Sequence, residues 1–291
     1  MASIILVAGM HRSGTSALTR CINLAGVPLP ARLMPADPDN ADGYWESADL
    51  YYLHNAILTS LQSAWNDPRE IPEAWFSGPA SAAAGAQLVA WLAEEMRGKD
   101  ALLVKDPRVC RLLPLWRHVA SELGLDVRTI ITVRNPIEVA RSLATRDGFS
   151  EPHSYFLWLR HVLDAERFSR STPRSFVTFD QLMADPLGTV RKVSRDLDAA
   201  FPTPEAKLRP LLDATLKPSL RHHTVADAAL AEVGEQLPAL LTTYRWVLDA
   251  AADKSPDTAP LDEITATMRA SEQSRGMAIV VPPDTTTARP N

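Results

Sequence analysis

Cysteine is scarce in this chain: only Cys21 and Cys110 occur in 291 residues. Two thiols exclude a disulfide framework, and neither has the C-x-x-C spacing of metal or redox sites. Apolar runs of the roughly 20 residues that span a bilayer are also missing. The chain begins almost directly with a short apolar run and has no basic leader segment. These absences predict a cytoplasmic protein without a membrane span.

An excess of basic residues is missing as well. The chain has 30 Lys and Arg against 35 Asp and Glu, a formal net charge of −5. Proteins that bind nucleic acid neutralise phosphates with basic patches, so this balance gives no electrostatic case for a nucleic-acid partner. With 46% hydrophobic and 22% charged residues the composition is globular, and the length fits one large domain.

The composition changes near the end of the chain. From about residue 252 it is rich in Pro, Thr, Asp and Ser, which predicts a folded domain over 1–251 and a flexible tail over 252–291. The apolar run 277–281 is the exception. It could dock on the body or on a partner chain, which leaves a homo-oligomer open.

Short apolar runs alternate with segments of helical spacing. The runs cover residues 4–8, 101–104, 128–133 and 175–179. This alternation predicts an α/β fold with a central parallel β-sheet flanked by helices. Ligands of such sheets bind at the carboxyl ends of the strands, so the residues that follow each run are the candidates for chemistry.

A glycine-bounded loop follows the first run and precedes a helical segment. It contains Arg12, Ser13 and Gly14, with Thr15 and Ser16 at the start of the helix. Backbone N–H groups and the positive end of a helix dipole make such a loop a cradle for an anion. The glycines have the Walker A spacing, but Thr15 stands where nucleotide-hydrolysing enzymes have lysine. Anion binding is favoured over packing alone, and the loop does not name the ligand.

Cations also follow the next two runs. Lys105 follows the second, Arg134 follows the third, and Ser142 comes eight residues later on a predicted helix. One cation could simply cap a surface loop. Three strand ends that deliver cations to one edge predict a ligand with more than one phosphate-like group.

These motifs resemble those of sulfotransferases that use 3′-phosphoadenosine-5′-phosphosulfate (PAPS). Residues 12–16 resemble the 5′-phosphosulfate loop, and 133–142 resemble the 3′-phosphate motif. Residues 105–108 and 179–186 are similar to stretches of bacterial members. The resemblance implies the P-loop NTPase-like sulfotransferase fold, PAPS as donor, no metal, and transfer to an acceptor hydroxyl. It also implies that the 12–16 loop holds the 5′ end, while the arginine and serine of the second motif hold the 3′-phosphate.

The catalytic base follows from the same resemblance. The phenol and steroid branch has a histidine where this chain has Pro107, so that base is missing. Another branch uses a glutamate soon after the first helix, and Glu46 fits that pattern. Lys105 and Arg12 would then stabilise the developing charge. The alternative for Glu46 is a first-turn glutamate favoured by the helix dipole; His54 and the aspartate after Lys105 are the next candidates for the base.

A basic segment near the C-terminus, residues 217–223, resembles a stretch of the bacterial subgroup. The resemblance implies that Arg221 and His222 close over the nucleotide; the alternative is that they are ordinary loop residues.

The acceptor is not readable from the sequence. We expect a small molecule or glycan, such as a saccharide, a glycolipid or a secondary metabolite. Several tryptophans between the first two strands fit either core packing or an acceptor platform: Trp45, Trp65, Trp75 and Trp91. The alternatives for the function are a P-loop kinase of a small metabolite, which would need magnesium ligands, and a non-catalytic nucleotide-binding protein.

Overall fold

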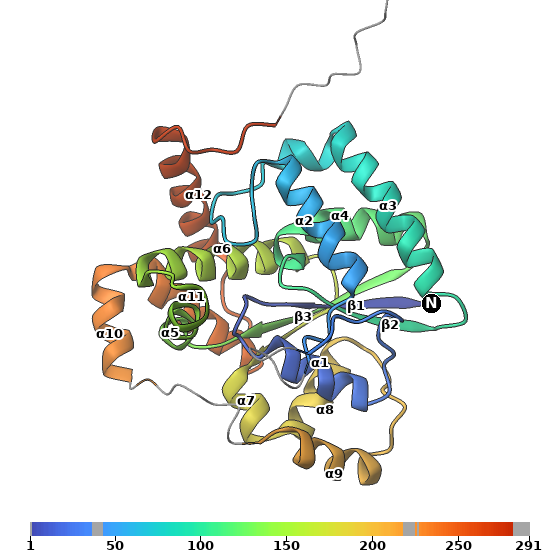
Figure 1. Cartoon of the computed structure of the whole chain (residues 1–291). Helices are drawn as coiled ribbons and strands as arrows, with labels where there is room; N and C mark the ends of the chain where they lie inside the picture. Colours follow the sequence, from blue (N-terminus) through green and yellow to red (C-terminus); the bar gives the residue numbers. More distant parts are fainter. Residues whose placement is uncertain (1, 37–42, 218–224, 226, 282–291) are drawn as a thin grey trace, which may run out of the picture.

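One parallel sheet organises the fold. The computed structural model describes residues 2–36, 43–217, 225 and 227–281. Four strands form the sheet in the order β2-β1-β3-β4: β1 (Ser3–Ala8), β2 (Ala101–Lys105), β3 (Asp126–Val133) and β4 (Arg174–Thr178). Every neighbouring pair is parallel. The predicted α/β class with a central parallel sheet flanked by helices is confirmed (Figure 1).

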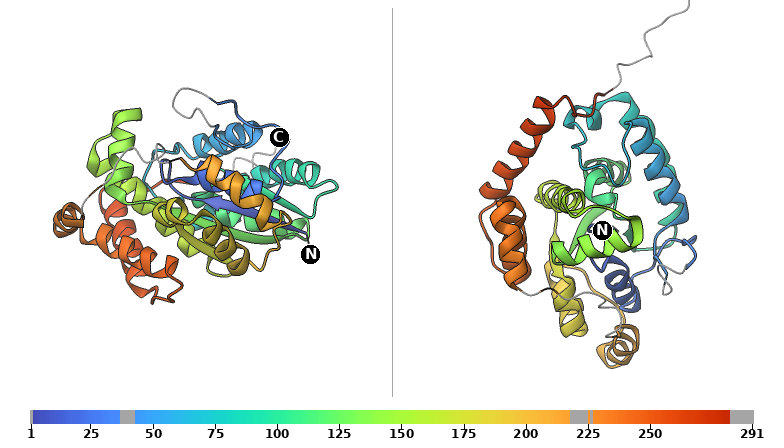
Figure 2. Two further views of the ribbon diagram at one scale, coloured as in Figure 1. Left: turned by 90° about the horizontal axis from the view of Figure 1, so that it is seen from below. Right: turned by 60° about the vertical axis from the view of Figure 1, so that its left-hand side comes forward.

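Helices cover both faces of the sheet, which is why the strands are nearly continuous apolar runs. In β1, Ile4 and Leu6 join one hydrophobic core, whereas Ile5 and Val7 join the other. The face of Ile5 is covered by α1 (Thr15–Leu24), α8 (Pro186–Asp196) and α9 (Glu205–Thr215). The face of Ile4 is covered mainly by α4 (Val109–Glu122), α5 (Pro136–Asp147), α6 (Glu151–Ser169) and α11 (Pro238–Ala251), as the two layers in Figures 1 and 2 show.

The remaining helices surround these layers. They are α2 (Ala48–Ser60), the 3₁₀ helix η1 (Glu73–Ser77), α3 (Pro79–Glu95), α7 (Phe179–Ala184), α10 (Asp227–Gln236) and α12 (Ala259–Ser274). Over the described part of the chain, no helix has the length and apolar character needed to cross a membrane.

The connections place a crevice at the carboxyl edge of the sheet. The chain leaves β1 toward α1 on one face and leaves β3 toward α5 on the other. Neighbouring parallel strands whose connections go to opposite faces leave a crevice between their carboxyl ends, and ligands bind there. The loops that follow β1 and β3 border this crevice.

The C-terminal segment is folded where the structure describes it, which corrects the expectation of a flexible tail from residue 252. Helix α12 buries Leu261 and Thr265, and Ile279 of the apolar run is also buried. Ile279 therefore packs against the body, whereas Met277 and Val280 of the same run are exposed; residues 282–291 lie outside the described part. The prediction from composition failed because composition does not show that Arg269 and Glu272 of α12 pair with buried charges of the body.

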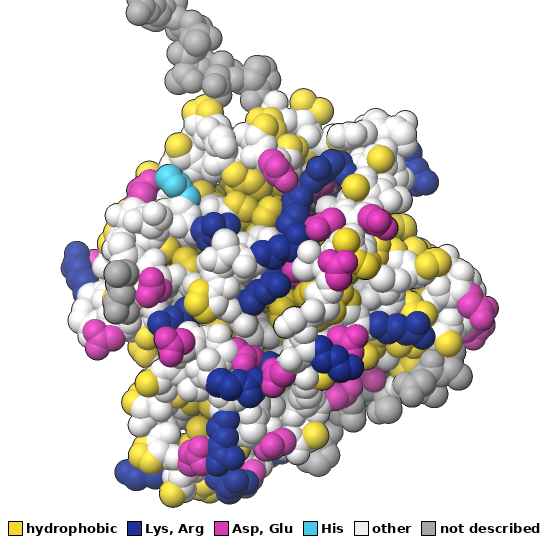
Figure 3. Space-filling model, turned by 180° about the vertical axis from the view of Figure 1, so that it is seen from behind, with side chains coloured by type: hydrophobic (Ala, Val, Ile, Leu, Met, Phe, Trp, Pro, Cys, Tyr) yellow, Lys and Arg dark blue, Asp and Glu magenta, His cyan; other side chains and the backbone are white. Residues whose placement is uncertain are grey.

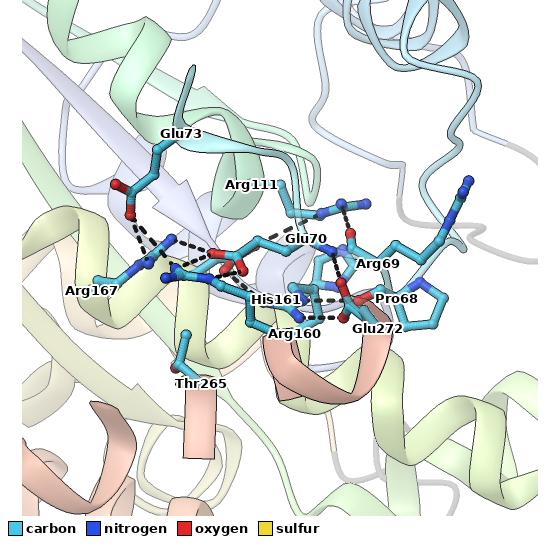
Figure 4. Close-up of polar contacts among 12 residues, drawn as sticks. Pro68, Arg69, Glu70, Glu73, Arg111, Arg160, His161, Arg167, Thr265 and Glu272 are labelled. Carbon is cyan, nitrogen blue, oxygen red and sulfur yellow. Dashed lines mark hydrogen bonds and ion pairs between the residues drawn. The ribbon is translucent and has the colours of Figure 1, made fainter. Parts of the chain in front are cut away.

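Those partners form a cluster between α12, α6 and the segment before η1 (Figure 4). Buried Arg160 donates to Glu272 at 2.7 Å and to the carbonyl of Pro68 at 2.9 Å. Glu272 also accepts from the backbone N–H of Glu70, whose carboxylate takes two bonds from Arg269. A buried charge is tolerated when it is paired and hydrogen-bonded, and α12 supplies those pairs.

Ion pairs also cover the outside of this region. Arg170, the C-cap residue of α6, donates to both Glu166 and Asp262, so α6 and α12 are joined at the surface as well. On the back of the molecule a band of Lys and Arg side chains has Asp and Glu side chains beside it (Figure 3).

The docking of α12 is testable through Leu261. Leu261→Ala is expected to lower the free energy of unfolding by about 2–4 kcal/mol, because it leaves a cavity in the core. Glu263→Ala on the exposed side of the same helix should change it by less than about 0.5 kcal/mol. Urea unfolding measures both, and equally small effects would contradict a docked helix.

Candidate active site

The loop between β1 and α1 has an unusual backbone. Arg12 has a φ of 68° and Gly14 a φ of 84°, both in the left-handed region. A Cβ on Gly14 would lie 2.4 Å from Cδ2 of Phe179, so only glycine fits here. Ser13 is buried, and its hydroxyl has no hydrogen-bond partner within the described part of the chain. Buried polar groups are normally satisfied, so this hydroxyl is a candidate ligand contact.

The two predicted phosphate motifs meet in space. Arg12 Nε donates a hydrogen bond to Ser142 Oγ at 2.7 Å, although the two residues are 130 positions apart. Arg12 comes from the loop after β1, and Ser142 lies on α5 after β3. This bond joins the loop after β1 to the helix after β3.

The third predicted cation lies next to the predicted base. Lys105 Nζ donates to Glu46 Oε1 at 2.5 Å and to the carbonyl of Tyr44 at 3.2 Å. It also donates to the hydroxyl of Ser16 at 3.4 Å, so β2, α1 and the segment before α2 converge on one ammonium. Both Lys105 and Glu46 are nearly buried, at 3% and 4% exposure.

Short backbone pairing fixes the position of Glu46. Its carbonyl accepts from the N–H of Met34 at 2.8 Å, and Ala48 N–H donates to the carbonyl of Arg32 at 3.0 Å. Ser47 then caps α2 by accepting from the N–H of Leu50. Glu46 therefore lies just before the helix rather than in its first turn, and its carboxylate bonds Lys105, not the helix N-terminus.

Burial raises the pKa of Glu46, and this effect outweighs the opposing attraction of Lys105. A carboxylate with a raised pKa is a stronger proton acceptor once it is ionised. The raised pKa of Glu46 therefore suits the role of a general base.

A second cation near Glu46, Arg108, was not among the predicted site residues. Its guanidinium lies 3.9 Å from Glu46 and 3.0 Å from Asp106, and its Nε donates to Asn55. It also stacks over the ring of Tyr51 at 4.8 Å. The similarity of residues 105–108 to a stretch of bacterial sulfotransferases was the available signal, because this range includes Arg108.

The reserve candidates for the base are engaged elsewhere. His54 Nδ1 lies 2.9 Å from Asp106, while its Nε2 accepts from Trp116 Nε1 at 3.1 Å. His54 is therefore the neutral tautomer with its proton on Nδ1. Arg108 and His54 overcome the effect of burial and hold the pKa of Asp106 well below its usual range. Both groups serve a buried network, which leaves Glu46 as the better candidate.

Arg134, the remaining predicted cation, is held at the end of β3. Its Nε donates to Glu138 at 2.7 Å, and its guanidinium lies over the ring of Phe179 at 4.5 Å. Because the same ring packs against Gly14, Phe179 joins Arg134 to the loop after β1. The predicted residues of both phosphate motifs are thus brought to one region, whereas Arg221 and His222 lie outside the described residues.

A row of aromatic rings extends from the loop. His11 lies 4.3 Å from Trp65 between ring centroids, and Trp65 lies 5.7 Å from Phe149. Burial is the largest cause of the lowered pKa of His11, so this imidazole is neutral. Among the tryptophans, Trp75 is buried in the core, whereas the Trp65 ring contacts His11 of the loop.

No protein-family model matches the chain, and no curated protein matches it. The chain is similar to solved sulfotransferases. A sulfotransferase domain of the olefin synthase from Synechococcus PCC 7002 is 19% identical, with 97% of this chain and 96% of that one covered and a TM-score of 0.44. A sulfotransferase from Alicyclobacillus acidocaldarius is 15% identical, with 88% and 98% covered and a TM-score of 0.46. One from Mycobacterium tuberculosis H37Rv is 20% identical, with 73% and 71% covered and a TM-score of 0.38. All three likenesses are remote.

The conformation of the loop can be tested with two glycines. Gly14 and Gly98 both have a positive φ, but a Cβ on Gly98 would meet no described atom within 4 Å. Gly98→Ala should therefore cost only the backbone term of about 1–2 kcal/mol. Gly14→Ala should cost about 1–3 kcal/mol more, because the Phe179 ring must move. Equal unfolding free energies of the two variants in urea would refute the tight contact.

Proposed function

We propose that this protein is a sulfotransferase that moves a sulfuryl group from PAPS to an acceptor hydroxyl. The observation that carries the proposal is the hydrogen bond between Arg12 and Ser142. It joins a loop suited to one phosphate-like group to a strand end suited to another. A donor with charged groups at both its 5′ and 3′ ends would engage both motifs.

The residues present fit such a donor. Within the described part of the chain the buried hydroxyl of Ser13 has no hydrogen-bond partner, and the backbone N–H groups of such a loop can bind an anion beside it. Arg134 and Ser142 would hold the 3′-phosphate, a group that ATP lacks. In the described part of the chain, no three His, Cys, Asp or Glu side chains could hold a metal ion together.

The chemistry that we propose uses three side chains. Bound PAPS would supply an activated sulfuryl group with a phosphate leaving group. Glu46 would accept the proton of the acceptor hydroxyl. Lys105 and Arg12 would place positive charge where negative charge develops, and fixed charges of this kind are usually the largest contribution to catalysis.

The acceptor that we propose is a small molecule or glycan: a saccharide, a glycolipid or a secondary metabolite. The aromatic row that begins at His11 and Trp65 supports an acceptor with a ring face. We also propose a cytoplasmic location, because both cysteines are unpaired and buried.

The donor is tested by calorimetry. Adenosine 3′,5′-bisphosphate should bind much more tightly than ATP, because only the first has a 3′-phosphate for Arg134. Arg134→Ala should weaken its binding about 10- to 100-fold, since one charge-assisted contact is lost. Equal affinity for the two nucleotides would sink the proposal. Turnover that EDTA abolishes and magnesium restores would favour a kinase.

The base is tested with Glu46→Gln, using the best acceptor from a panel of the classes above. Turnover should fall on the order of a hundred- to ten-thousandfold while affinity for the bisphosphate stays near wild type. Because Glu46 must be ionised to accept a proton, wild-type turnover should decline as the pH falls, at a pH above the usual pKa of 4.5.

Lys105→Ala is the contrasting variant. It should lower turnover and also weaken donor binding, because the Lys105 ammonium contacts Glu46 and also Ser16 at the start of α1. If Glu46→Gln keeps nearly normal turnover, and its turnover declines at low pH as that of wild type does, Glu46 is not the base.

A further inference from the structure

Arg134 is restrained from three directions. Glu138 accepts from its Nε at 2.7 Å, and Phe179 supports the face of the guanidinium at 4.5 Å. Its backbone carbonyl accepts from Trp158 Nε1 at 3.1 Å. A long arginine side chain normally has many rotamers, so this set of contacts fixes a group that would otherwise be mobile.

Glu138 does not do what a glutamate at this position usually does. It occupies the third position of α5, where a glutamate commonly bonds back to the helix N-cap. Here Asn135 caps the helix by accepting from the N–H of Ile137. The carboxylate of Glu138 instead uses Oε2 for Arg134, and Oε1 accepts from the backbone N–H of Val225 at 3.3 Å. With both oxygens engaged, the carboxylate itself is fixed.

We propose that Glu138 is a positioning residue for donor recognition: it holds Arg134 in the orientation that binds the 3′-phosphate. This rests on the proposed function. Glu138 bonds Nε of Arg134, and because the guanidinium is planar and rigid, this one bond sets the orientation of the whole group. Glu138 is 4% exposed and Arg134 7% exposed, so the pair is set before the donor arrives. Because the side chain is already ordered, donor binding does not have to include the entropy cost of ordering it.

A negative carboxylate near an incoming phosphate also has a repulsive effect, which predicts the opposite result. If repulsion dominated, removing the charge of Glu138 would tighten binding. If positioning dominates, the same change weakens it, and only for ligands with a 3′-phosphate. The direction of the change therefore decides between the two.

Calorimetry of Glu138→Gln with two ligands provides the test. Adenosine 3′,5′-bisphosphate should bind about 3- to 10-fold more weakly than to wild type, because Arg134 must now be ordered on binding. Adenosine 5′-phosphate should bind within about twofold of wild type. Equal weakening of both ligands, or unchanged or tighter binding of the bisphosphate, overturns the proposal.

Glu166→Gln is the matched control. Glu166 is also a buried carboxylate paired with an arginine four residues away, Arg170. It bonds Arg174 at the amino end of β4, and the candidate site lies at the carboxyl ends of the strands. This variant should leave both affinities unchanged, and a selective loss there would also overturn the proposal.

Two further arms separate the possible failures. If Glu138→Gln does not fold, Glu138→Asp keeps the charge but draws the carboxylate back by one methylene. It should show the same selective loss, and wild-type affinities would overturn the proposal. If wild type itself does not prefer the bisphosphate to adenosine 5′-phosphate, the proposed function fails instead.

Discussion

Buried cations at the carboxyl edge of the sheet need carboxylates, and this requirement shapes the whole site. Each of three basic side chains near the strand ends has its own acidic partner: Lys105 with Glu46, Arg108 with Asp106, and Arg134 with Glu138. An unpaired buried charge costs several kcal/mol, so these pairs are a condition for folding as well as for chemistry. The acidic partners come from the chain before α2, the end of β2 and α5, which ties these segments to the sheet.

The pairing also fixes the positions of the basic side chains. A cradle made only of free cations would repel itself and stay mobile until a ligand arrived. Here each cation is fixed, and further atoms hold several of the carboxylates in turn. His54 and Trp116 extend one of these chains of contacts into the core beneath α4. The resulting electrostatics are set in advance, so the proposed transfer would need little reorganisation as charge develops.

The sequence predicted the sheet well because fully buried parallel strands are continuous apolar runs, and all four runs became strands. Phe179 is an exception: it was expected in the fourth strand but begins α7, since Thr178 caps that helix. The candidate residues of the two phosphate motifs came from local patterns, and their role stays a prediction. The partners of Arg108, and those of α12, were not predictable. Helical spacing shows which face is buried, but it does not show which distant charge will meet it.

The link between α12 and the segment before η1 also has a consequence for synthesis. Glu272 bonds the backbone of Glu70, 202 residues earlier in the chain. At about 5–20 residues per second, the ribosome needs roughly 10–40 s to make that stretch. During this time the segment that carries Trp65 lacks its last partner; Arg160, which is 112 residues before Glu272, lacks it for roughly 6–22 s. In the last part of this time, after Thr178 has been made, a chaperone that shields this region would act on a nascent chain whose four strands are already synthesised.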